Sequence, residues 1–520
     1  MSYVSRQNIG GAIIEETLID EFDGGMTNNA RVRDFRYSRV LRNFDVLTTK
    51  NKLVPFGGLT GETFDTGTDA TTKLCKMVSA NSKLYGLGVV SGQAYPKVFE
   101  KTGATGSWVA STTGEDSTGT RSEKLFIEYQ DIIYGANYVS SSDTRIFGYA
   151  YLTNTFTSTA LDLGTLGGDL SASTIAIPAV VHKKTDILYV AHDNYVLKKD
   201  GGAVTVNWSL ALTLPTNSVI VDMCEYGNYI AIATKSKYTA QNSTLYIWDG
   251  DSSLETVTDK ADWGIGELQQ IEEVEGYLIG ISTSPLGITY SNADAKIVFK
   301  QYVGGIEGTK QFLEIPISSL TIDFAGKQKV NGRMYFMMSC AISSVQFDGI
   351  WSIGRMGTGN FALSFDRESK VTSITSNISK GFFLYGDWMH SMFTDNGAYV
   401  INRTRDSGVF DTGTAIYESL IFNNGDSSKK KKLLGVTVMY EPFDSDDVVV
   451  MKYKKDEETS FTQIFSDTTN NAVSHDAINI ESSAAALPEY KEIQFRLEST
   501  KGAAITAYKF KSIIYDKGMY

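Results

Sequence analysis

The chain has 520 residues, of which 42% are hydrophobic and 21% charged, so it can bury a large core and does not belong to the disordered class. Tyrosine (28), phenylalanine (26) and glycine (47) are abundant and proline (8) is scarce, which favours many β-strands joined by tight turns. A net charge of −12 argues against tight nucleic-acid binding, because phosphate binding requires clustered cations. No apolar run approaches the roughly 18 residues of a membrane span, and the first twenty residues lack the apolar segment of a secretory signal.

Residues 1–65 are predicted to form an N-terminal docking arm. An acidic, glycine-rich step at 20–26 precedes a stretch in which arginines alternate with aromatic residues. Arginine and tyrosine are enriched in protein interfaces, whereas the same alternation can also stack on nucleic-acid bases. Because acidic residues lie nearby, protein docking is favoured over nucleic acid. The candidate interface residues of this arm are Arg31, Arg33, Arg36, Arg39, Arg42 and Phe44.

A short strand of aliphatic and aromatic residues, introduced by a polar turn, recurs seven times between residues 83 and 386. The copies lie 41 to 57 residues apart, close to the ~40–50 residues of one four-stranded propeller blade. A single four-stranded sheet cannot bury both of its apolar faces, so neighbouring sheets must stack around an axis. Residues 66–414 are therefore predicted to form a six- or seven-bladed β-propeller, and an irregular β-sandwich is the alternative. The copies are Lys83–Gly86, Asp131–Gly135, Asp186–Tyr189, Gly227–Ile230, Gly276–Gly280, Gly332–Phe336 and Gly381–Gly386.

Local signals within this region give further expectations. Glycines near the repeated strands are expected at crowded inner positions where backbones approach closely. The polar stretch Glu267–Glu275, confined by glycines, could form one or two helical turns. Asp-Gly steps at 249–250 and 348–349 predict hairpin turns, because this dipeptide tolerates positive φ.

Residues 415–520 show the cleanest alternation of apolar and polar residues in the chain. In stretches such as Val436–Tyr440 and Ile493–Leu497 every second residue is apolar, so the apolar side chains share one face of the strand. This pattern is typical of half-buried antiparallel strands. This region is predicted to be a β-sandwich, to which the N-terminal segment could contribute. At its start, Lys429, Lys430, Lys431 and Lys432 are candidate interface residues for an acidic neighbouring subunit, although such lysines are more often simply solvated.

Catalytic signatures are sparse in this sequence. It contains no HExxH motif, no nucleophile elbow, no Walker loop and no dinucleotide fingerprint. The distant cysteines Cys75, Cys224 and Cys340 are predicted to be buried thiols. Because His182 and His192 flank one predicted strand, which holds them apart, a metal site is not expected there. We therefore expect no enzymatic activity, no catalytic residues, no cofactor and no metal.

The order of the parts resembles that of tail-nozzle or tail-tube proteins of short-tailed bacteriophages. The resemblance depends on an opening EFDGGMTN step at Glu21–Asn28, an arginine-rich stretch ending at Arg42–Asp45, the long β repeat, and closing strands at Tyr490–Leu497 and Ala504–Phe510. In that family a β-propeller is joined to a β-sandwich assembled from the chain's ends, and six copies form the distal tube. Another virion propeller, such as a tail-tip or fibre-attachment protein, would show the same layout.

The resemblance implies a mechanical role in the virion tail, after synthesis in the host cytoplasm. Copies would close into a homo-oligomeric ring, a hexamer, and dock to other tail proteins such as the adaptor and fibres. An acidic lining would let DNA pass during ejection without tight binding. Two other classes remain open, namely a carbohydrate-active or glycan-binding propeller and a monomeric intracellular scaffold. For the first, Trp248, Trp351 and Trp388 could stack on sugar rings, although core packing is commoner for such residues.

Overall fold

The computed structural model of the protein forms two compact units. Unit 1 comprises Met1–Thr60, Gly349–Glu368 and Thr404–Tyr520, and unit 2 comprises Gly61–Asp348 and Ser369–Arg403. The only helix among the described residues is the 3-10 turn η3 (Gly305–Glu307), so the predicted all-β class is confirmed. The structure describes residues 3–9, 12–27, 34, 36–47, 51–56, 59–62, 73–89, 97–103, 106–115, 120–140, 143–163, 177–238, 242–251, 257–283, 295–317, 323–342, 345–355, 360–368, 378–385, 388–395, 398–404, 414–442, 446–478 and 487–515.

The division differs from the three predicted segments, most clearly for residues 1–60 and 349–368. Residues 1–60 group with the C-terminal region because their strands pair with C-terminal strands, so they are not a separate arm. Gly349–Glu368, predicted to lie in the propeller, is also grouped with unit 1.

Seven four-stranded antiparallel sheets follow one another along the middle of the chain, and we number them 1 to 7. Sheets 1 to 4 consist of β8 (Lys73–Ala80), β9 (Lys83–Val89), β10 (Lys97–Thr102) and β11 (Val109–Glu115); β12 (Thr120–Tyr129), β13 (Ile132–Ser140), β14 (Asp143–Ala150) and β15 (Thr155–Asp162); β16 (Ala179–His182), β17 (Ile187–His192), β18 (Tyr195–Lys199) and β19 (Trp208–Thr213); and β20 (Ser218–Tyr226), β21 (Tyr229–Ser236), β22 (Asn242–Trp248) and β23 (Asp259–Ile265).

Sheets 5 to 7 complete the series, and the last takes its fourth strand from the N-terminal part of the chain. They consist of β24 (Glu267–Val274), β25 (Tyr277–Thr283), β26 (Lys296–Gly304) and β27 (Gly308–Pro316); β28 (Asp323–Val330), β29 (Arg333–Ile342), β30 (Val345–Gly354) and β31 (Ala362–Glu368); and β32 (Ile378–Tyr385), β33 (Trp388–Asp395), β34 (Ala398–Thr404) and β7 (Leu59–Gly61). The boundary between the units passes within β30 of sheet 6, within β7 of sheet 7 and at the last residue of β34.

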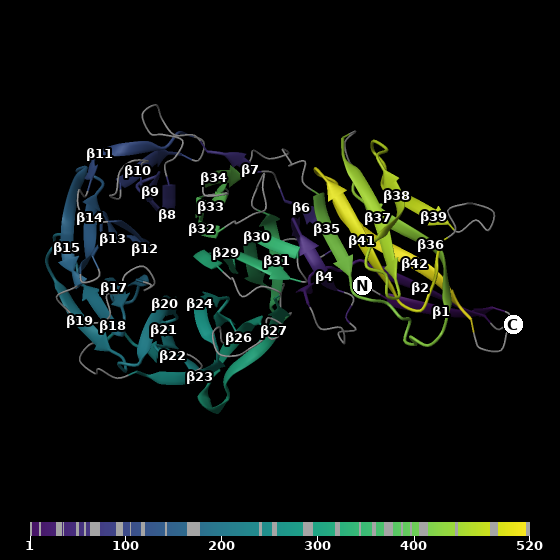
Figure 1. Cartoon of the computed structure of the whole chain (residues 1–520), viewed down its shortest axis with the longest axis horizontal. Helices are drawn as coiled ribbons and strands as arrows, with labels where there is room; N and C mark the ends of the chain where they lie inside the picture. The colour runs from purple at the N-terminus through teal and green to yellow at the C-terminus, as the bar shows by residue number, and fades with distance from the viewer. Residues whose placement is uncertain are drawn as a thin grey trace. The chain divides into compact units, whose positions relative to one another are not determined.

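The first strands of the seven sheets form a closed circle within unit 2. Each of β8, β12, β16, β20, β24 and β28 contacts the first strand of the next sheet, and β32 contacts β8 again. Figure 1 shows the sheets of unit 2 following one another around a common centre. The predicted propeller is therefore confirmed, and of the two predicted blade numbers the structure has seven.

Tight hairpins explain the repeat seen in the sequence. Six of the seven copies lie at the start of a second strand, directly after the turn from the first, whereas the seventh lies in the first strand β32. At four of these turns both residues have positive φ, the geometry that suits two-residue hairpins. These pairs are Asn81-Ser82, Gln130-Asp131, Glu275-Gly276 and Asn331-Gly332.

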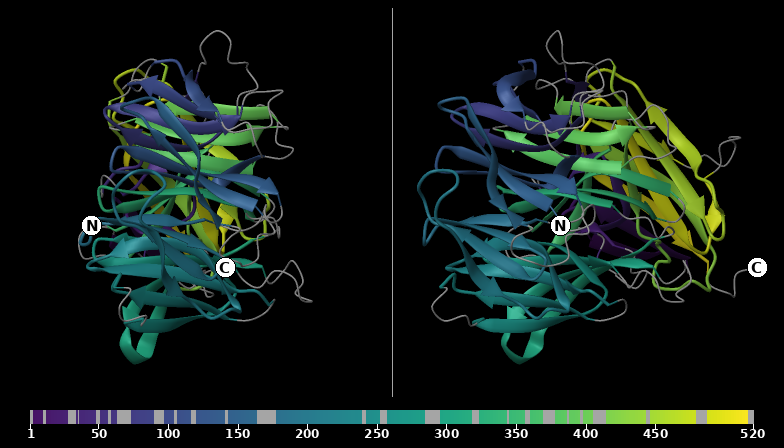
Figure 2. Two further views of the ribbon diagram at one scale, coloured as in Figure 1. Left: turned by 90° about the vertical axis from the view of Figure 1, so that its left-hand side faces the viewer. Right: turned by 60° about the vertical axis from the view of Figure 1, so that its left-hand side comes forward.

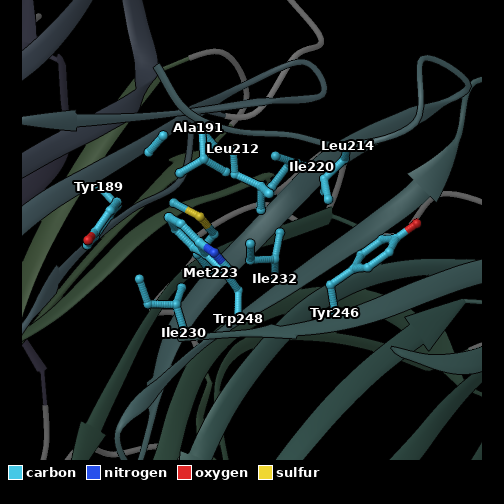
Figure 3. Packing of buried hydrophobic residues seen from close by; sticks show 12 residues of the cluster. Tyr189, Ala191, Leu212, Leu214, Ile220, Met223, Ile230, Ile232, Tyr246 and Trp248 are labelled. Carbon is cyan, nitrogen blue, oxygen red and sulfur yellow. The ribbon is translucent and has the colours of Figure 1, made fainter. Parts of the chain in front are cut away.

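Apolar side chains fill the spaces between neighbouring sheets, as the stacking argument requires. Between sheets 3 and 4, the ring of Tyr189 meets the indole of Trp248 edge-on, with centroids 5.2 Å apart (Figure 3). Ile220, Met223 and Ile232 pack in the same cluster. Burial of such side chains contributes roughly 25 cal/mol per Å² and is the main force holding sheet to sheet.

Polar side chains also link neighbouring sheets through backbone groups. Each link gives a backbone donor or acceptor of one sheet a side-chain partner from the next. The links are Tyr129 hydroxyl to Asp186 carbonyl (2.7 Å, sheets 2 and 3), Ile271 N–H to Asp222 Oδ2 (2.8 Å, sheets 4 and 5), Gln270 Nε2 to Gly326 carbonyl (3.2 Å, sheets 5 and 6), Gln328 Nε2 to Leu384 carbonyl (3.1 Å, sheets 6 and 7) and Tyr385 hydroxyl to Ser82 carbonyl (2.8 Å, sheets 7 and 1).

Three glycines of the repeat are crowded by side chains rather than by backbones. Gly86, Gly135 and Gly280 all lie in second strands, where a side chain would meet Leu74 and Trp108 at Gly86, Phe147 at Gly135 and Trp263 at Gly280. The expectation that they occupy inner positions of close backbone approach is wrong for these three, because side chains take the space beside each.

Unit 1 is a sandwich of two sheets that combine both ends of the chain (Figure 2). Aromatic rings pack between the sheets, as in Tyr417 against Tyr508 and Phe495 against Phe510. One sheet contains β1 (Tyr3–Ile9), β2 (Ala12–Ile19), β42 (Ile505–Ile514), β36 (Lys431–Tyr440), β39 (Ser474–Ile478) and β40 (Glu489–Tyr490); the other contains β3 (Gly25–Met26), β4 (Tyr37–Arg42), β35 (Thr414–Ser419), β41 (Ile493–Thr500), β37 (Val448–Lys455) and β38 (Thr462–Asp467), and β5 (Phe44–Asp45) pairs with β6 (Val54–Pro55).

Candidate interaction site

Two of the predicted arginines, Arg39 and Arg42, lie in the strand β4 rather than in a free arm. β4 pairs with β3 and with β35; Ser38 and Leu41 are buried, whereas Arg39 and Arg42 are partly exposed. Arg31 and Arg33 lie outside the described residues. Arg39 is half-buried in β4 and stays a predicted interface residue.

Arg36 is engaged within its own chain. Its Nε donates to Asp34 Oδ1 at 3.0 Å, its Nη2 lies 2.5 Å from Asp34 Oδ2, and its Nη1 lies 3.9 Å from Asp23 Oδ1. These charge-assisted bonds raise the pKa of Arg36 and lower the pKa of Asp34, because each charged form is stabilised by the other. The pair is about one-third exposed, so a partner could still reach it.

Two other predicted arm residues serve the fold. Arg42 forms an ion pair with Glu368, and both belong to unit 1. Phe44 is completely buried, so its side chain offers no surface to a partner of the folded chain. We therefore withdraw Phe44 from the candidate interface.

The four lysines at the start of β36 divide into two kinds. Lys430 is exposed and lies 3.0 Å from Glu489 Oε2, while Lys429 and Lys432 are half-buried. Lys431 is fully buried, contrary to the expectation of solvated or interface lysines. Alternation along the strand explains the difference, because every second side chain points into the sandwich.

The ammonium of Lys431 is held by backbone carbonyls. Its Nζ donates to the carbonyl oxygens of Asp426 (2.5 Å), Lys429 (2.9 Å) and Lys491 (2.7 Å). Burial lowers the pKa of Lys431, because desolvation disfavours the charged form. Three carbonyl acceptors match the three N–H donors of an ammonium, so Lys431 joins the loop before β36 to the turn between β40 and β41.

In the propeller, the ammonium of Lys327 links three sheets. It lies 2.6 Å from Asp222 Oδ2 in sheet 4 and donates to the Ile271 carbonyl of sheet 5 at 2.5 Å. Glu272 Oε2 is 3.6 Å away, and burial raises the pKa of this carboxyl group. This cluster was not predicted, because its members come from three strands that are distant in sequence and carry no local motif.

The tryptophans proposed as sugar platforms are buried where the structure describes them. Trp248 and Trp351 are both fully buried, and the side chain of Trp388 lies outside the described residues. Trp248 packs in the core shown in Figure 3. Exposed aromatic rings occur instead at Tyr229 and Tyr277, which are 38% and 37% exposed. They occupy equivalent positions, as the first residues of the second strands in sheets 4 and 5.

The thiols and histidines of the described regions fit structural roles. Cys224 and Cys340 are buried free thiols whose pKa is raised by desolvation, as predicted, and the side chain of Cys75 lies outside the described residues. His182 and His192 end successive strands and are buried. Among the described residues, no group of three or more His, Cys, Asp or Glu side chains is arranged to hold a metal ion. In the same residues no helix has the length and hydrophobicity to cross a bilayer.

Comparison with known proteins gives only distant structural likenesses. No family model and no curated protein matches the sequence. Among solved structures, the chain is similar to a prolyl endopeptidase (6% identity, 68% of this chain and 53% of that chain, TM-score 0.38), to the Dos1 propeller (10%, 69% and 90%, 0.39) and to the SapL1 lectin (12%, 57% and 95%, 0.32). The chain thus spans about half the length of the endopeptidase. At these identities and scores the likenesses carry no argument about function.

Proposed function

We propose that the protein is a non-enzymatic structural component of a bacteriophage virion. In this role, copies of the chain assemble as a ring around the DNA conduit of the tail and dock to neighbouring tail proteins. The observation that supports the proposal most is the composition of unit 1. Its two sheets combine β1 to β4 with β35 to β42, so the sandwich is built from both ends of the chain, and the propeller strands come from the sequence between those ends. This is the layout that the resemblance to tail-nozzle proteins implies.

The prominent charged clusters of the described residues are consistent with a mechanical role. Lys327 joins three sheets, Lys431 joins two segments of the sandwich, and Arg496 donates to Glu418 across two paired strands. Each cluster stabilises the fold by holding together parts that are distant in sequence. A net charge of −12 would also repel DNA phosphates, which favours passage without sticking.

The proposal is tested by the mass and shape of the purified protein. Light scattering coupled to size exclusion should give about six times 57.1 kDa, and negative-stain images should show closed rings. Duplex DNA at physiological salt should bind weakly. A strictly monomeric protein at all concentrations, or tight duplex binding, would contradict the proposal.

A glycan-binding propeller is the second candidate, favoured by one observation. Tyr229 and Tyr277 expose their rings at equivalent positions of adjacent sheets, and aromatic faces of this kind stack on sugar rings. A panel of oligosaccharides should distinguish the two candidates. Binding or cleavage that disappears in Tyr229→Ala and Tyr277→Ala would favour the glycan candidate, whereas the structural role predicts neither.

A further inference from the structure

The last sheet of the propeller is completed by a strand from a distant part of the chain. Sheet 7 has the order β32-β33-β34-β7, in which β7 contains only three residues and precedes the other strands by more than 300 residues. Sheet 7 is thus completed by the pairing of β34 with β7, two strands that are not consecutive in the chain. A three-residue strand forms few backbone hydrogen bonds, so closure needs further contacts.

Glu62, the residue after β7, supplies such contacts inside unit 2. Its Oε2 accepts hydrogen bonds from Lys101 Nζ and from Trp108 Nε1, the latter at 3.1 Å. Its Oε1 lies 3.6 Å from His390 Nδ1. The side chains of Glu62, Lys101 and His390 are at most 1% exposed. These buried side chains form one polar cluster.

The members of the cluster come from both sides of the place where the circle closes. Lys101 belongs to β10 of sheet 1, and Trp108 lies just before β11 of the same sheet. His390 belongs to β33 of sheet 7. The apolar cluster around Trp108 includes Phe383 of sheet 7, so the indole also packs across the seam between the two sheets.

The electrostatics make Glu62 the central member. Burial opposes ionisation of its carboxyl group, but the interactions with His390 and Lys101 outweigh burial and lower its pKa. The ionised carboxylate therefore compensates the Lys101 ammonium, which lies 5.5 Å from the centroid of the Trp108 ring. Without that carboxylate the ammonium would be left as an uncompensated charge in the interior, which is strongly unfavourable.

We propose that Glu62 is the latch of the propeller: its carboxylate compensates Lys101 and holds sheets 7 and 1 together after β7 has docked, and its loss beside a charged Lys101 opens this seam before any other. The other six seams join sheets whose strands are consecutive in the chain, and polar and apolar contacts tie them. The seam between sheets 7 and 1 depends in addition on a segment that has to return from the N-terminal side. Opening at this seam would expose the apolar faces with which sheets 7 and 1 pack, while the remaining sheets stay stacked.

Hydrogen exchange measured by mass spectrometry on the full-length chain tests the proposal. In Glu62→Gln, amide exchange in β8–β10 and β32–β33 should rise on the order of a hundredfold, while β20–β25 should change little. Asp222→Asn is the matched control, because it disturbs a buried lysine pair elsewhere and should raise exchange in sheets 4 to 6 instead. Equal acceleration in all seven sheets, or no acceleration, would overturn the latch.

A second variant keeps the test decisive if Glu62→Gln does not fold. Glu62→Leu combined with Lys101→Met removes both charges together and leaves no uncompensated ammonium. Folding and seam protection close to those of the wild type would support the proposal that charge balance at Glu62 controls the seam. If the double variant unfolds as readily as Glu62→Gln, packing rather than the ion pair holds the seam, and the proposal fails. The result is independent of ring assembly.

Discussion

Lys327 and Asp222 form an ion pair between two propeller sheets that are not neighbours. Lys327 lies in β28 of sheet 6 and Asp222 in β20 of sheet 4, and their charged atoms are 2.6 Å apart. The same ammonium donates to the Ile271 carbonyl of sheet 5, which lies between them. Since Asp222 also accepts from the Ile271 N–H, one ion pair fixes the relative positions of three inner strands.

Removal of the Lys327 ammonium should strongly destabilise the propeller. Lys327→Met leaves Asp222 and Glu272 without their compensating charge, so we expect a loss of about 3–5 kcal/mol in the free energy of unfolding. Urea titration followed by tryptophan fluorescence measures this. Lys329→Met is the matched control, because Lys329 pairs with Glu273 at the surface and its loss should cost about 0–1 kcal/mol. Equal effects of the two substitutions would show that the three-sheet link contributes nothing special.

A methyl group at Gly280 should destabilise the contact between sheets 4 and 5. The indole of Trp263 lies directly over Gly280, so an alanine side chain would overlap the ring. We expect Gly280→Ala to lower stability by about 1–3 kcal/mol through overpacking. In a Trp263→Leu background, where the ring is absent, the same substitution should cost much less. Additive losses in the double variant, measured by denaturant titration, would count against the overlap.

Substitutions of the four lysines at the start of β36 should distinguish an effect on folding from an effect on ring assembly. Lys431→Met leaves three buried carbonyl groups without their donor, so unfolding should become easier by about 1–3 kcal/mol. Charge reversal of Lys429, Lys430 and Lys432 should leave the melting temperature nearly unchanged and reduce ring formation. Thermal melts and light scattering on both variants measure the two effects. The interface assignment would be refuted if the triple variant assembled normally.

The stabilising effect of Glu62 should depend on pH. The pKa of Glu62 is lowered in the folded chain from its usual value of 4.5, so the ionised carboxylate contributes stability above that value. The contribution is lost as pH falls through the lowered folded pKa. The titratable groups that face the carboxylate are Lys101 and His390. The difference in unfolding free energy between the wild type and Glu62→Gln should therefore shrink below about pH 4.5. A difference that stays constant down to pH 3 would contradict this assignment.

The sequence predicted the repeat well because the repeat is local. Hairpin turns such as Asn81-Ser82 and Asn331-Gly332 lie between strands that are adjacent in the chain, and their residues tolerate positive φ. Alternation in β41 predicted correctly that Ile493, Phe495 and Leu497 face the core. Such features depend on residues within about ten positions of one another, so one sequence is enough to find them.

Other local signals were misleading because tertiary pairing overrides them. The stretch Glu267–Glu275 was expected to form helical turns, but it forms the inner strand β24, which pairs with β25. The Asp-Gly step at 348–349 was expected to form a hairpin turn, yet it lies inside β30. Gln494 alternates with Ile493 and Phe495, so the pattern predicts that it points outward, but it is buried and its Nε2 donates to the Ser419 carbonyl.

The buried polar clusters could not be predicted from single positions. Glu62, Lys101 and His390 are ordinary residues in the sequence, and nothing near them indicates that they meet. They come together only because β7 joins the last sheet and the first strands form a circle. Likewise, nothing in a run of four lysines indicates that Lys431 alone is buried until the strand and its register are known.

The two units cannot be separated by a single cut of the polypeptide. Unit 1 is assembled from three stretches of chain and unit 2 from two, so the chain passes between them four times. A fragment spanning residues 66–414 would lack β7 and Glu62, and a fragment spanning 415–520 would lack β1 to β4. Truncated expression clones would therefore carry unpaired strand edges and aggregate, and any dissection of the molecule must rely on substitutions in the intact polypeptide.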